Sequence, residues 1–511
     1  MATSGADLLA LHALTKPDKA AVIEGDRALT YAEVHDRANR AAGAFKALGV
    51  EAGDRIAGIS YNGYEGTETG FAGQRLQAVG VPINWHLRAN EVAYILNDCG
   101  AKVVTVGPEF VEVVQAAIPD IEGERQYVLL RGDPPAGWHS YTALLAAHGG
   151  EDYTEQERRL GATMIYTSGT TGRPKGAFRP LGVSVENVLI AIATFGLQES
   201  DVHLVAGPGY HSAVGFFRVV NTLVGATNVL MPRFDAEQAL RLIEKHRVTT
   251  TYMAPTLIAR ILNLPEEVKR SIDPGSLRLI IAGAAPFPFS LKQRCIEYFG
   301  EVLLEFYGAT ETSFNTVLRP EDQLRKPGSC GQAIPGQEIR LLDEEGIEVP
   351  VGVPGEIWVR NDVLAEYYKR PEATSKSMRD GFFSVGDIAY RDEEGFYFIC
   401  DRKIDMIISG GVNIYPAEIE AVLAAHPAIA DAAVIGVPNE EFGEEVKAVV
   451  QLRPGSSTTA GELVAFCNDR LAGYKRPRTV DFVDELPRDL AGKLQKRKLR
   501  EAYWAGSGRS I

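Results

Sequence analysis

The sequence predicts an α/β protein: a large N-terminal domain of β-α-β units with mixed sheets, followed by a small mobile α+β C-terminal domain. A chain of 511 residues exceeds what one hydrophobic core normally supports. Helical and strand-like patterns alternate from the start, as at 31–48 and 55–59, which is typical of parallel β-α-β units. A new alternating pattern begins after a short charged stretch, so we expect domains at 1–401 and 406–511 with a hinge at 402–405.

The composition and charge exclude several classes of protein. Apolar residues make up 45% of the chain and charged residues 23%, as in ordinary globular proteins. The net charge of -14 argues against binding to nucleic acid or to anionic membranes. Five scattered cysteines without a CxxC pair predict reduced thiols and a cytoplasmic location. We find neither a secretory signal nor an apolar run long enough to span a membrane.

The most distinctive stretch is a loop rich in glycine and hydroxyl groups, which follows a short apolar run at 162–165. Its sequence at 166–176 reads Tyr-Thr-Ser-Gly-Thr-Thr-Gly-Arg-Pro-Lys-Gly. Glycines let the backbone approach a ligand closely, and the hydroxyls and lysine form a concave positive surface that suits phosphate. The Walker pattern is excluded because Pro174 precedes Lys175 and Gly176 follows it. By composition alone, a solvated flexible loop would be the simpler interpretation.

Several predicted strands further along the chain end in glycine, proline or small residues. These strands are expected at 202–205, 249–253, 277–281 and 302–306. Ligands of open α/β sheets gather beyond the carboxyl ends of the strands, so the turns that follow these strands should border one crevice. A hairpin is predicted at 388–398, where acidic residues and glycine suit a tight turn.

Five short motifs occur in an order that is found in one enzyme superfamily. The loop at 166–176 is followed by Tyr-Gly-Ala-Thr-Glu at 307–311, Gly-Asp at 386–387, Ser-Gly-Gly-Val-Asn-Ile-Tyr-Pro at 409–416 and Gly-Lys at 492–493. The chain therefore resembles the fatty-acyl-CoA synthetase-like branch of the adenylate-forming superfamily, which includes the AMP-dependent synthetases and ligases. The resemblance covers essentially the whole chain.

The resemblance, rather than any spacing, implies the roles of individual residues. It implies an ATP and AMP site that consists of Thr167, Ser168, Gly169, Thr170, Thr171, Gly172, Gly283, Ala284, Ala285, Tyr307, Gly308, Asp387 and Arg402. In that site Tyr307 would stack on adenine, while Asp387 and Arg402 would contact the ribose. Catalytic roles are implied for Lys493, Glu311, Thr310 and Lys175. Glu311 would also be the ligand of Mg²⁺.

An acyl and thiol pocket is implied near an aromatic-histidine pair. Its expected members are Tyr210, His211, Ser212, Gly215, Ala282, Ala309, Thr312 and Phe314. By residue type alone, a single histidine after a strand is more often structural, and the resemblance favours the pocket. The small and apolar side chains suggest an aliphatic, alicyclic or aryl acid. Gly207 and Gly209 are expected to leave room for a bulky acyl group.

The predicted C-terminal domain carries two further features of the resemblance. Gly410 and Gly411 lie in a loop that, in relatives, enters the active site on the CoA side. The hinge would comprise Lys403, Ile404 and Asp405, although relatives place an Asp or Lys where this chain has Ile404. The basic run that follows Lys493 is typical of a solvated helix face.

The implied reaction joins a carboxylic acid to coenzyme A at the expense of ATP, with an acyl-adenylate intermediate and Mg²⁺ as cofactor. An adenylating enzyme that loads an acyl-carrier protein shares the first half-reaction and remains an alternative. A catalytically degenerate nucleotide-binding protein would lack Lys493, Glu311 or Asp387, and all three are present. An esterase is disfavoured because no Gly-x-Ser-x-Gly motif occurs. Homodimers are common among similar enzymes.

Overall fold

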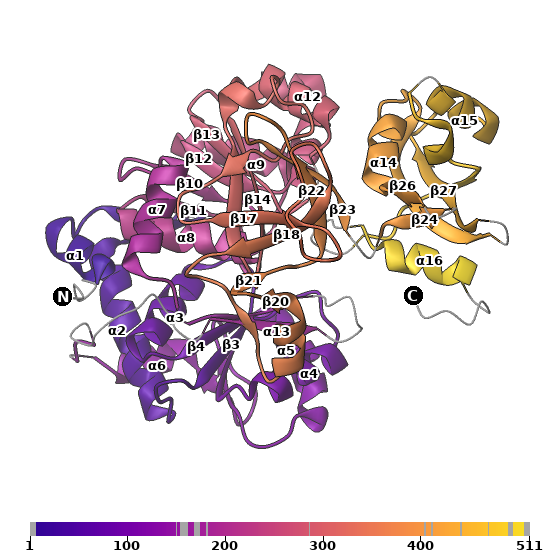
Figure 1. Ribbon diagram of the computed structural model, residues 1–511. Helices are drawn as coiled ribbons and strands as arrows, with labels where there is room; N and C mark the ends of the chain where they lie inside the picture. Colours follow the sequence, from indigo (N-terminus) through magenta and orange to yellow (C-terminus); the bar gives the residue numbers. More distant parts are fainter. Residues whose placement is uncertain are drawn as a thin grey trace.

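The computed structural model has a large body of mixed α/β structure and a small lobe beside it, the latter in orange and yellow in Figure 1. It describes residues 7–149, 151–153, 162–167, 174–179, 182–285, 287–402, 405–409, 412–439, 442–468, 470–488 and 494–504, except for the side chains of Arg402 and Asn413. The predicted fold class is confirmed, because parallel β-α-β sheets and antiparallel sheets occur together in the large body.

The central sheet has the strand order β16-β15-β14-β13-β12-β10-β11-β1-β2. Its strands are β1 Ala20–Glu24, β2 Arg27–Thr30, β10 Val202–Val205, β11 Thr227–Leu230, β12 Thr250–Met253, β13 Leu279–Ala282, β14 Leu303–Ala309, β15 Ser313–Leu318 and β16 Gln332–Ala333. The helices along this part of the chain are α1 Leu8–Thr15, α7 Val185–Phe195, α8 Ser212–Val224, α9 Ala236–His246, α10 Pro255–Leu262, α11 Glu266–Arg270, α12 Phe289–Phe299 and the short η3 Pro320–Asp322.

The middle of this sheet is parallel and buried on both faces. Strands β11, β12 and β13 consist entirely of buried residues, as expected for parallel strands that are covered by helices on each side. Strands β10, β12, β13 and β14 run in the same direction, so their carboxyl ends lie along one edge. The turns that were expected to meet there do leave the sheet at the same edge.

A second sheet, β4-β3-β5-β6-β7, is parallel throughout. It comprises β3 Arg55–Ile59, β4 Val79–Pro82, β5 Val103–Val106, β6 Gln126–Leu129 and β7 His139–Ser140. The helices of this region are α2 Tyr31–Ala47, α3 Tyr64–Arg75, α4 Ala89–Cys99, α5 Val111–Ala117, α6 Tyr141–Ala147, η1 Pro108–Phe110 and η2 Ile118–Asp120. Helix α2 begins where expected because Thr30 and Glu33 form a reciprocal capping box.

Two further sheets complete the large body. A three-stranded sheet pairs β8 Met164–Thr167, β9 Lys175–Phe178 and β19 Glu366–Tyr367, and the sequence had not predicted it. The other contains β17 Glu338–Leu342, β18 Gly355–Arg360, β20 Met378–Arg379, β21 Phe382–Phe383, β22 Asp387–Arg391 and β23 Tyr397–Arg402, with α13 Pro371–Ser377 nearby in the chain. Strands β22 and β23 form the predicted hairpin.

The small lobe is the predicted α+β unit. Its sheet contains β24 Ile407–Ser409, β25 Val412–Ile414, β26 Ile429–Asn439, β27 Gly443–Leu452 and β28 Thr479–Phe482. Its helices are α14 Pro416–Ala424, α15 Ala460–Asn468, α16 Lys496–Trp504 and the short η4 Gly473–Lys475. Strand β26 is long because it pairs along its whole length with β27.

The large body and the small lobe contact each other through a buried charged cluster. The Asp401 carboxylate, at the end of β23, accepts a hydrogen bond from the Ala417 amide in α14 at 2.9 Å. The Lys496 ammonium in α16 lies 3.7 Å from Asp401 and 2.9 Å from Glu420. Of the predicted hinge residues, Asp405 is described and contributes to the charge around Lys496, whereas Lys403 and Ile404 lie outside the described residues. The hinge and the domain limits stay predictions.

Two expectations from composition can be compared with this fold. All five cysteines lie in the described part of the chain and none of them forms a disulfide. Among the described residues, no helix combines the length and the apolarity that crossing a bilayer requires.

Candidate active site

Some of the predicted site residues cannot be placed. Those that lie outside the described residues are Ser168, Gly169, Thr170, Thr171, Gly172, Gly410, Gly411 and Lys493. The side chain of Arg402 is likewise not described.

Glu311 is the centre of a group of hydroxyl donors. Its side chain is buried, and one carboxylate oxygen, Oε1, accepts hydrogen bonds from the Thr167 hydroxyl at 3.2 Å and the Tyr367 hydroxyl at 3.0 Å. Thr167 ends strand β8, Glu311 lies between β14 and β15, and Tyr367 is in β19. Three segments that are distant in sequence therefore meet at one carboxylate. Burial and the nearby negative charge of Glu311 raise the pKa of Tyr367, so its hydroxyl remains a donor at neutral pH.

Thr310 lies between the first turn of α8 and an arginine. Its hydroxyl is 3.4 Å from the hydroxyl of Ser212, which begins α8. Its carbonyl accepts a short hydrogen bond from the guanidinium of Arg179, which also donates from Nε to the Val363 carbonyl at 2.6 Å. The sequence had singled out Thr310 and Ser212 but not Arg179.

Lys175 begins strand β9, and its ammonium lies 5.0 Å from the centre of the Tyr367 ring. This cation-π contact places the lysine on the same side of the three-stranded sheet as the Glu311 group. The segment that carries Tyr367 is joined to its surroundings by backbone hydrogen bonds: the Ala365 amide donates to the Glu311 carbonyl at 2.8 Å. Tyr367 thus belongs to the candidate site, and no local sequence pattern marks it, because its position depends on long-range strand pairing.

Tyr307 and Asp387 are joined directly. The Tyr307 hydroxyl donates to the Asp387 carboxylate at 2.7 Å, so the expected adenine and ribose contacts are adjacent. The predicted end of the strand at residue 306 was wrong, because β14 continues to Ala309 with a bulge at Tyr307 and Gly308. A Cβ at Gly308 would lie 2.0 Å from the Ser313 carbonyl oxygen, so only glycine allows this approach of β14 and β15.

The turn after β13 is tight and strained. A Cβ at Gly283 would come within 2.8 Å of the Phe306 ring, so glycine lets the turn pack onto β14. Ala284 has a φ of 70°, a left-handed conformation that costs free energy for any residue with a side chain. Ala284 is exposed and Ala285 partly so, whereas Ala282 is buried at the end of β13. Such strain at a strand end is frequent where a backbone must be presented to a ligand.

The loop before α8 is held by Asn62. The Asn62 amide donates to the Gly207 carbonyl at 2.8 Å and accepts from the Gly209 amide at 2.8 Å. The room that we expected beside the two glycines is absent: a Cβ at Gly207 would lie 2.9 Å from Val214 Cγ2, and one at Gly209 only 2.7 Å from Asn62 Oδ1. These glycines allow close packing rather than a bulky acyl group.

Aromatic rings flank this loop. The rings of Tyr210 and His211 are stacked with centroids 5.6 Å apart, and Trp85 meets Tyr210 edge-on at 5.8 Å. The backbone around Gly215 is close to this loop, since a Cβ there would lie 3.3 Å from the Gly209 carbonyl oxygen. The predicted Tyr210, His211, Ser212 and Gly215 are therefore close to one another, and Ser212 contacts Thr310.

The remaining members of the predicted pocket differ in their surroundings. Ala309 ends β14, next to Thr310. The Thr312 hydroxyl is buried and accepts a hydrogen bond from the Asn315 amide at 3.0 Å. Phe314 is in the main hydrophobic core, where its ring centroid is 4.7 Å from that of Phe306. Phe314 thus packs with other aromatic rings rather than standing beside Thr310.

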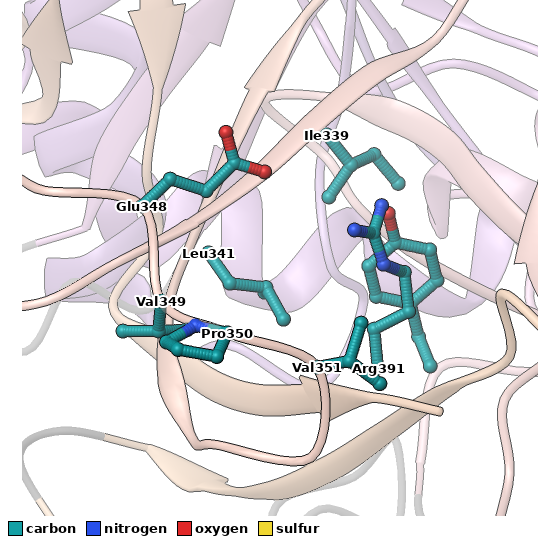
Figure 2. Close-up of a pocket in the computed structure, with 8 residues that line it drawn as sticks. Ile339, Leu341, Glu348, Val349, Pro350, Val351 and Arg391 are labelled. Carbon is teal, nitrogen blue, oxygen red and sulfur yellow. The ribbon is translucent and has the colours of Figure 1, made fainter. Parts of the chain in front are cut away.

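A small surface pocket lies elsewhere, on the sheet of β17, β18, β22 and β23. Figure 2 shows its lining of Ile339, Leu341, Glu348, Val349, Pro350, Val351 and Arg391, together with Tyr397. None of the predicted site residues lines it.

In the described part of the chain no three His, Cys, Asp or Glu side chains form a metal-binding group. One buried carboxylate such as Glu311 nevertheless suits Mg²⁺, which commonly binds one or two carboxylates together with substrate phosphates.

The chain matches known enzyme families over most of its length. The model of the AMP-binding enzyme family matches residues 9–369, and that of the AMP-binding enzyme C-terminal domain matches 418–493. The chain is 37% identical to an indoleacetate–CoA ligase of Aromatoleum aromaticum, with 96% of each chain covered. It is 34% identical to the fatty acid–[acyl-carrier-protein] ligase ScoC of Streptomyces coeruleorubidus, with 98% of this chain and 96% of the relative covered.

A solved structure extends the similarity to the whole fold. The crystal structure of the anthranilate CoA ligase AuaEII in complex with anthranoyl-AMP superposes with a TM-score of 0.87. Its sequence is 29% identical to this chain, and the alignment covers 98% of both.

Proposed function

The chain belongs to the AMP-binding enzyme family, and we propose that it is an ATP-dependent carboxylic acid:CoA ligase that works through an acyl-adenylate. The observation that carries the proposal is the group around Glu311, where the Thr167 and Tyr367 hydroxyls bind the carboxylate next to Lys175, and Thr310 is the preceding residue. Hydroxyls, a buried carboxylate and a lysine at the border of a glycine-rich loop are the groups that a triphosphate requires.

In the first half-reaction, a carboxylate oxygen of the acid attacks the α-phosphorus of ATP. The bond from that phosphorus to the bridging oxygen breaks, and pyrophosphate leaves with the electron pair. Negative charge accumulates as this happens, so Lys175, the Thr310 hydroxyl and Lys493 would hold the phosphate oxygens. Mg²⁺ held by Glu311 would supply further charge neutralisation at the phosphates.

The nucleoside would be held on the other side of the site. Tyr307 offers its ring to adenine and Asp387 its carboxylate to the ribose hydroxyls, with the turn at 283–285 alongside. We assign Arg402 to the same group. The contact between Tyr307 and Asp387 fixes the orientation of both side chains before a nucleotide binds.

In the second half-reaction, the thiol of coenzyme A attacks the acyl carbonyl carbon of the adenylate. The bond from that carbon to the phosphate oxygen of AMP breaks, AMP leaves, and the thiol proton is released. Lys493 serves only the first step, so we propose that the C-terminal lobe turns about 402–405 and brings Gly410 and Gly411 to the site. The thiol would pass the Tyr210 and His211 rings.

The acid is proposed to be hydrophobic and of aryl or aliphatic type. Small or apolar side chains predominate among the predicted pocket members, and the two CoA ligases compared above act on indoleacetate and on anthranilate by name. Because Gly207 and Gly209 are packed against neighbouring side chains, the pocket does not extend beside them. Free thiols fit a reducing compartment, so we propose a cytoplasmic location and, by analogy with similar enzymes, a homodimer.

One relative is named as a carrier-protein ligase, which favours a second candidate: the same adenylation followed by transfer to a carrier-protein pantetheine. The test is ATP-dependent pyrophosphate release with aryl acids and short, medium and long fatty acids, each with and without CoA. Release with equal formation of acyl-CoA supports the ligase. Release without any CoA product supports the carrier-protein enzyme.

The catalytic assignment is tested in the same assay with two lysine variants. Lys493→Ala is expected to slow pyrophosphate release by about 100-fold or more, the size expected when one charge-stabilising donor is lost. Lys498→Ala removes an exposed charge five residues further on and serves as the matched control, with release within about threefold of the wild type. Equal effects in both variants would contradict the role of Lys493.

A further inference from the structure

Arg179 is a cation whose partners are backbone carbonyls. It follows strand β9 directly, and its guanidinium donates to the carbonyls of Thr310 and Val363. Throughout the described ranges, no carboxylate oxygen lies within 4.0 Å of it as an ion-pair partner, and the side chain is partly buried. Because desolvating a charge costs free energy, a partly buried guanidinium without a paired carboxylate is stabilised by hydrogen bonds to neutral groups.

The two carbonyls belong to the segments that carry the candidate catalytic groups. Thr310 is adjacent to Glu311. Val363 begins the segment 363–367, called the strap, which ends at Tyr367. The same strap is attached to Glu311 twice: by the Ala365 amide to its carbonyl and by the Tyr367 hydroxyl to its carboxylate. Arg179 thus braces β9, the Thr310 turn and the strap at a single point.

The charge of Arg179 is also directed toward this group. Burial lowers the pKa of Arg179 to about 10, and the negative charge of Glu311 opposes that shift. The guanidinium therefore remains protonated at neutral pH. Its positive charge is held at the turn that carries the Thr310 hydroxyl and the Glu311 carboxylate.

We propose that Arg179 is a positioning residue for adenylation: by binding the Thr310 and Val363 carbonyls, it fixes the Thr310 hydroxyl and the Glu311 carboxylate in their working orientation. The proposal rests on the ligase function proposed above. A guanidinium suits this task because its planar fork holds two acceptors in a fixed geometry, whereas the ammonium of lysine is a flexible point charge.

The test compares Arg179→Met and Arg179→Lys with the wild type in the pyrophosphate release assay. Arg179→Met is expected to lower kcat by about 100-fold, since a displacement of about 1 Å in a reacting group has effects of that size. KM for ATP should change by less than about threefold, because the nucleoside contacts at Tyr307 and Asp387 are untouched. Arg179→Lys keeps the charge and should recover part of kcat.

A second readout does not depend on activity. Amide hydrogen exchange in peptides that cover 308–314 and 361–368 should become faster in Arg179→Met, since the brace between these segments is lost. The control is Arg75→Met, in which a buried guanidinium, bound to His35, is removed from α3. It is expected to lower thermal stability while kcat and the exchange of both segments stay close to the wild type.

The outcomes separate the two proposals. If the wild type releases pyrophosphate and Arg179→Met retains kcat within about threefold, with unchanged exchange at 308–314, the positioning role is wrong. If the wild type releases none with any acid, the ligase function fails, and the exchange data alone decide whether Arg179 braces the segments. If Arg75→Met and Arg179→Met lose kcat and thermal stability to the same extent, Arg179 has a structural role and not a positioning role.

Discussion

Lys292→Met removes the cation from a buried ion pair that supports the strand beneath the candidate site. Lys292 in α12 is 1% exposed and pairs with the carboxylate of Glu305 in β14, two residues before Tyr307. Without the ammonium, the Glu305 carboxylate is left buried and uncompensated. Breaking a buried pair in this way typically costs about 3–5 kcal/mol. The isosteric methionine limits the contribution from lost packing.

The cost should depend on pH in a direction that the environment of Glu305 determines. Burial raises the pKa of Glu305, and the Lys292 ammonium opposes that shift. In the variant the opposing charge is gone, so the folded-state pKa rises further above the unfolded value. As pH falls, Glu305 is therefore protonated at a higher pH in the folded variant than in the unfolded chain. The destabilisation is absent below the unfolded-state pKa of Glu305 and grows as pH rises toward its folded-state pKa.

Differential scanning calorimetry at pH 8 and pH 5.5 measures this dependence. One proton changes stability by at most about 1.4 kcal/mol per pH unit, so the cost at pH 5.5 should be smaller by up to about 3 kcal/mol. An unfolding entropy of about 2 cal/mol/K per residue over roughly 400 cooperating residues converts 3–5 kcal/mol into about 4–6 °C. We therefore expect Tm to fall by about 4–6 °C at pH 8 and by about 0–2 °C at pH 5.5.

The control is the double variant Lys292→Met, Glu305→Gln, which has no buried charge at this point. It should regain most of the lost Tm at pH 8, because an amide can be buried at much lower cost than a carboxylate. An equal loss of Tm at both pH values would refute the reasoning, since it would mean that lost packing, not the unpaired carboxylate, destabilises the variant.

Three further outcomes are expected. Tyr367→Phe removes the hydrogen bond from the hydroxyl to Glu311 but keeps the ring beside Lys175, so pyrophosphate release should slow by about 10-fold at constant Tm. An unchanged rate would contradict the role of that hydrogen bond. Tyr307→Phe keeps the ring and loses the contact with Asp387, so KM for ATP should rise about 3- to 10-fold, whereas Tyr307→Ala should raise it further in the same kinetic assay. Lys496→Met leaves the carboxylates of Asp401 and Glu420 without their shared cation between the lobes, so limited proteolysis after residue 402 should become faster. Cleavage at the wild-type rate would mean that this cluster does not hold the two lobes together.

The central architecture was predictable because its strands are apolar and locally bounded. The strand expected at 55–59 has the same limits in β3, and the hairpin around 392–395 forms as expected. In both segments the signal is local: a run of apolar residues ends at turn residues. Parallel strands that are buried on both faces show this signal most clearly, because every position must be apolar or hydrogen-bonded.

The features that the sequence did not predict depend on contacts between distant segments. Strand β14 continues beyond residue 306 because β15 pairs with it, and the Glu311 group depends on β19 pairing with β9. Arg179 and Tyr367 act through residues more than fifty positions away, so no local pattern marks them. The space beside Gly207 was misjudged for the same reason, since the side chain of Val214 occupies it.

The surroundings of Glu311 show why such a site needs its distant parts. In the portion that the structure describes, the donors to this carboxylate are two neutral hydroxyls, and the nearest arginine binds carbonyls instead. An ion pair with Arg179 would have neutralised the carboxylate that we propose as the ligand of Mg²⁺. By engaging the guanidinium at Thr310 and Val363, the fold keeps the negative charge of Glu311 available and still fixes its position. This division of roles requires three segments to be brought together by strand pairing, which only the folded chain achieves.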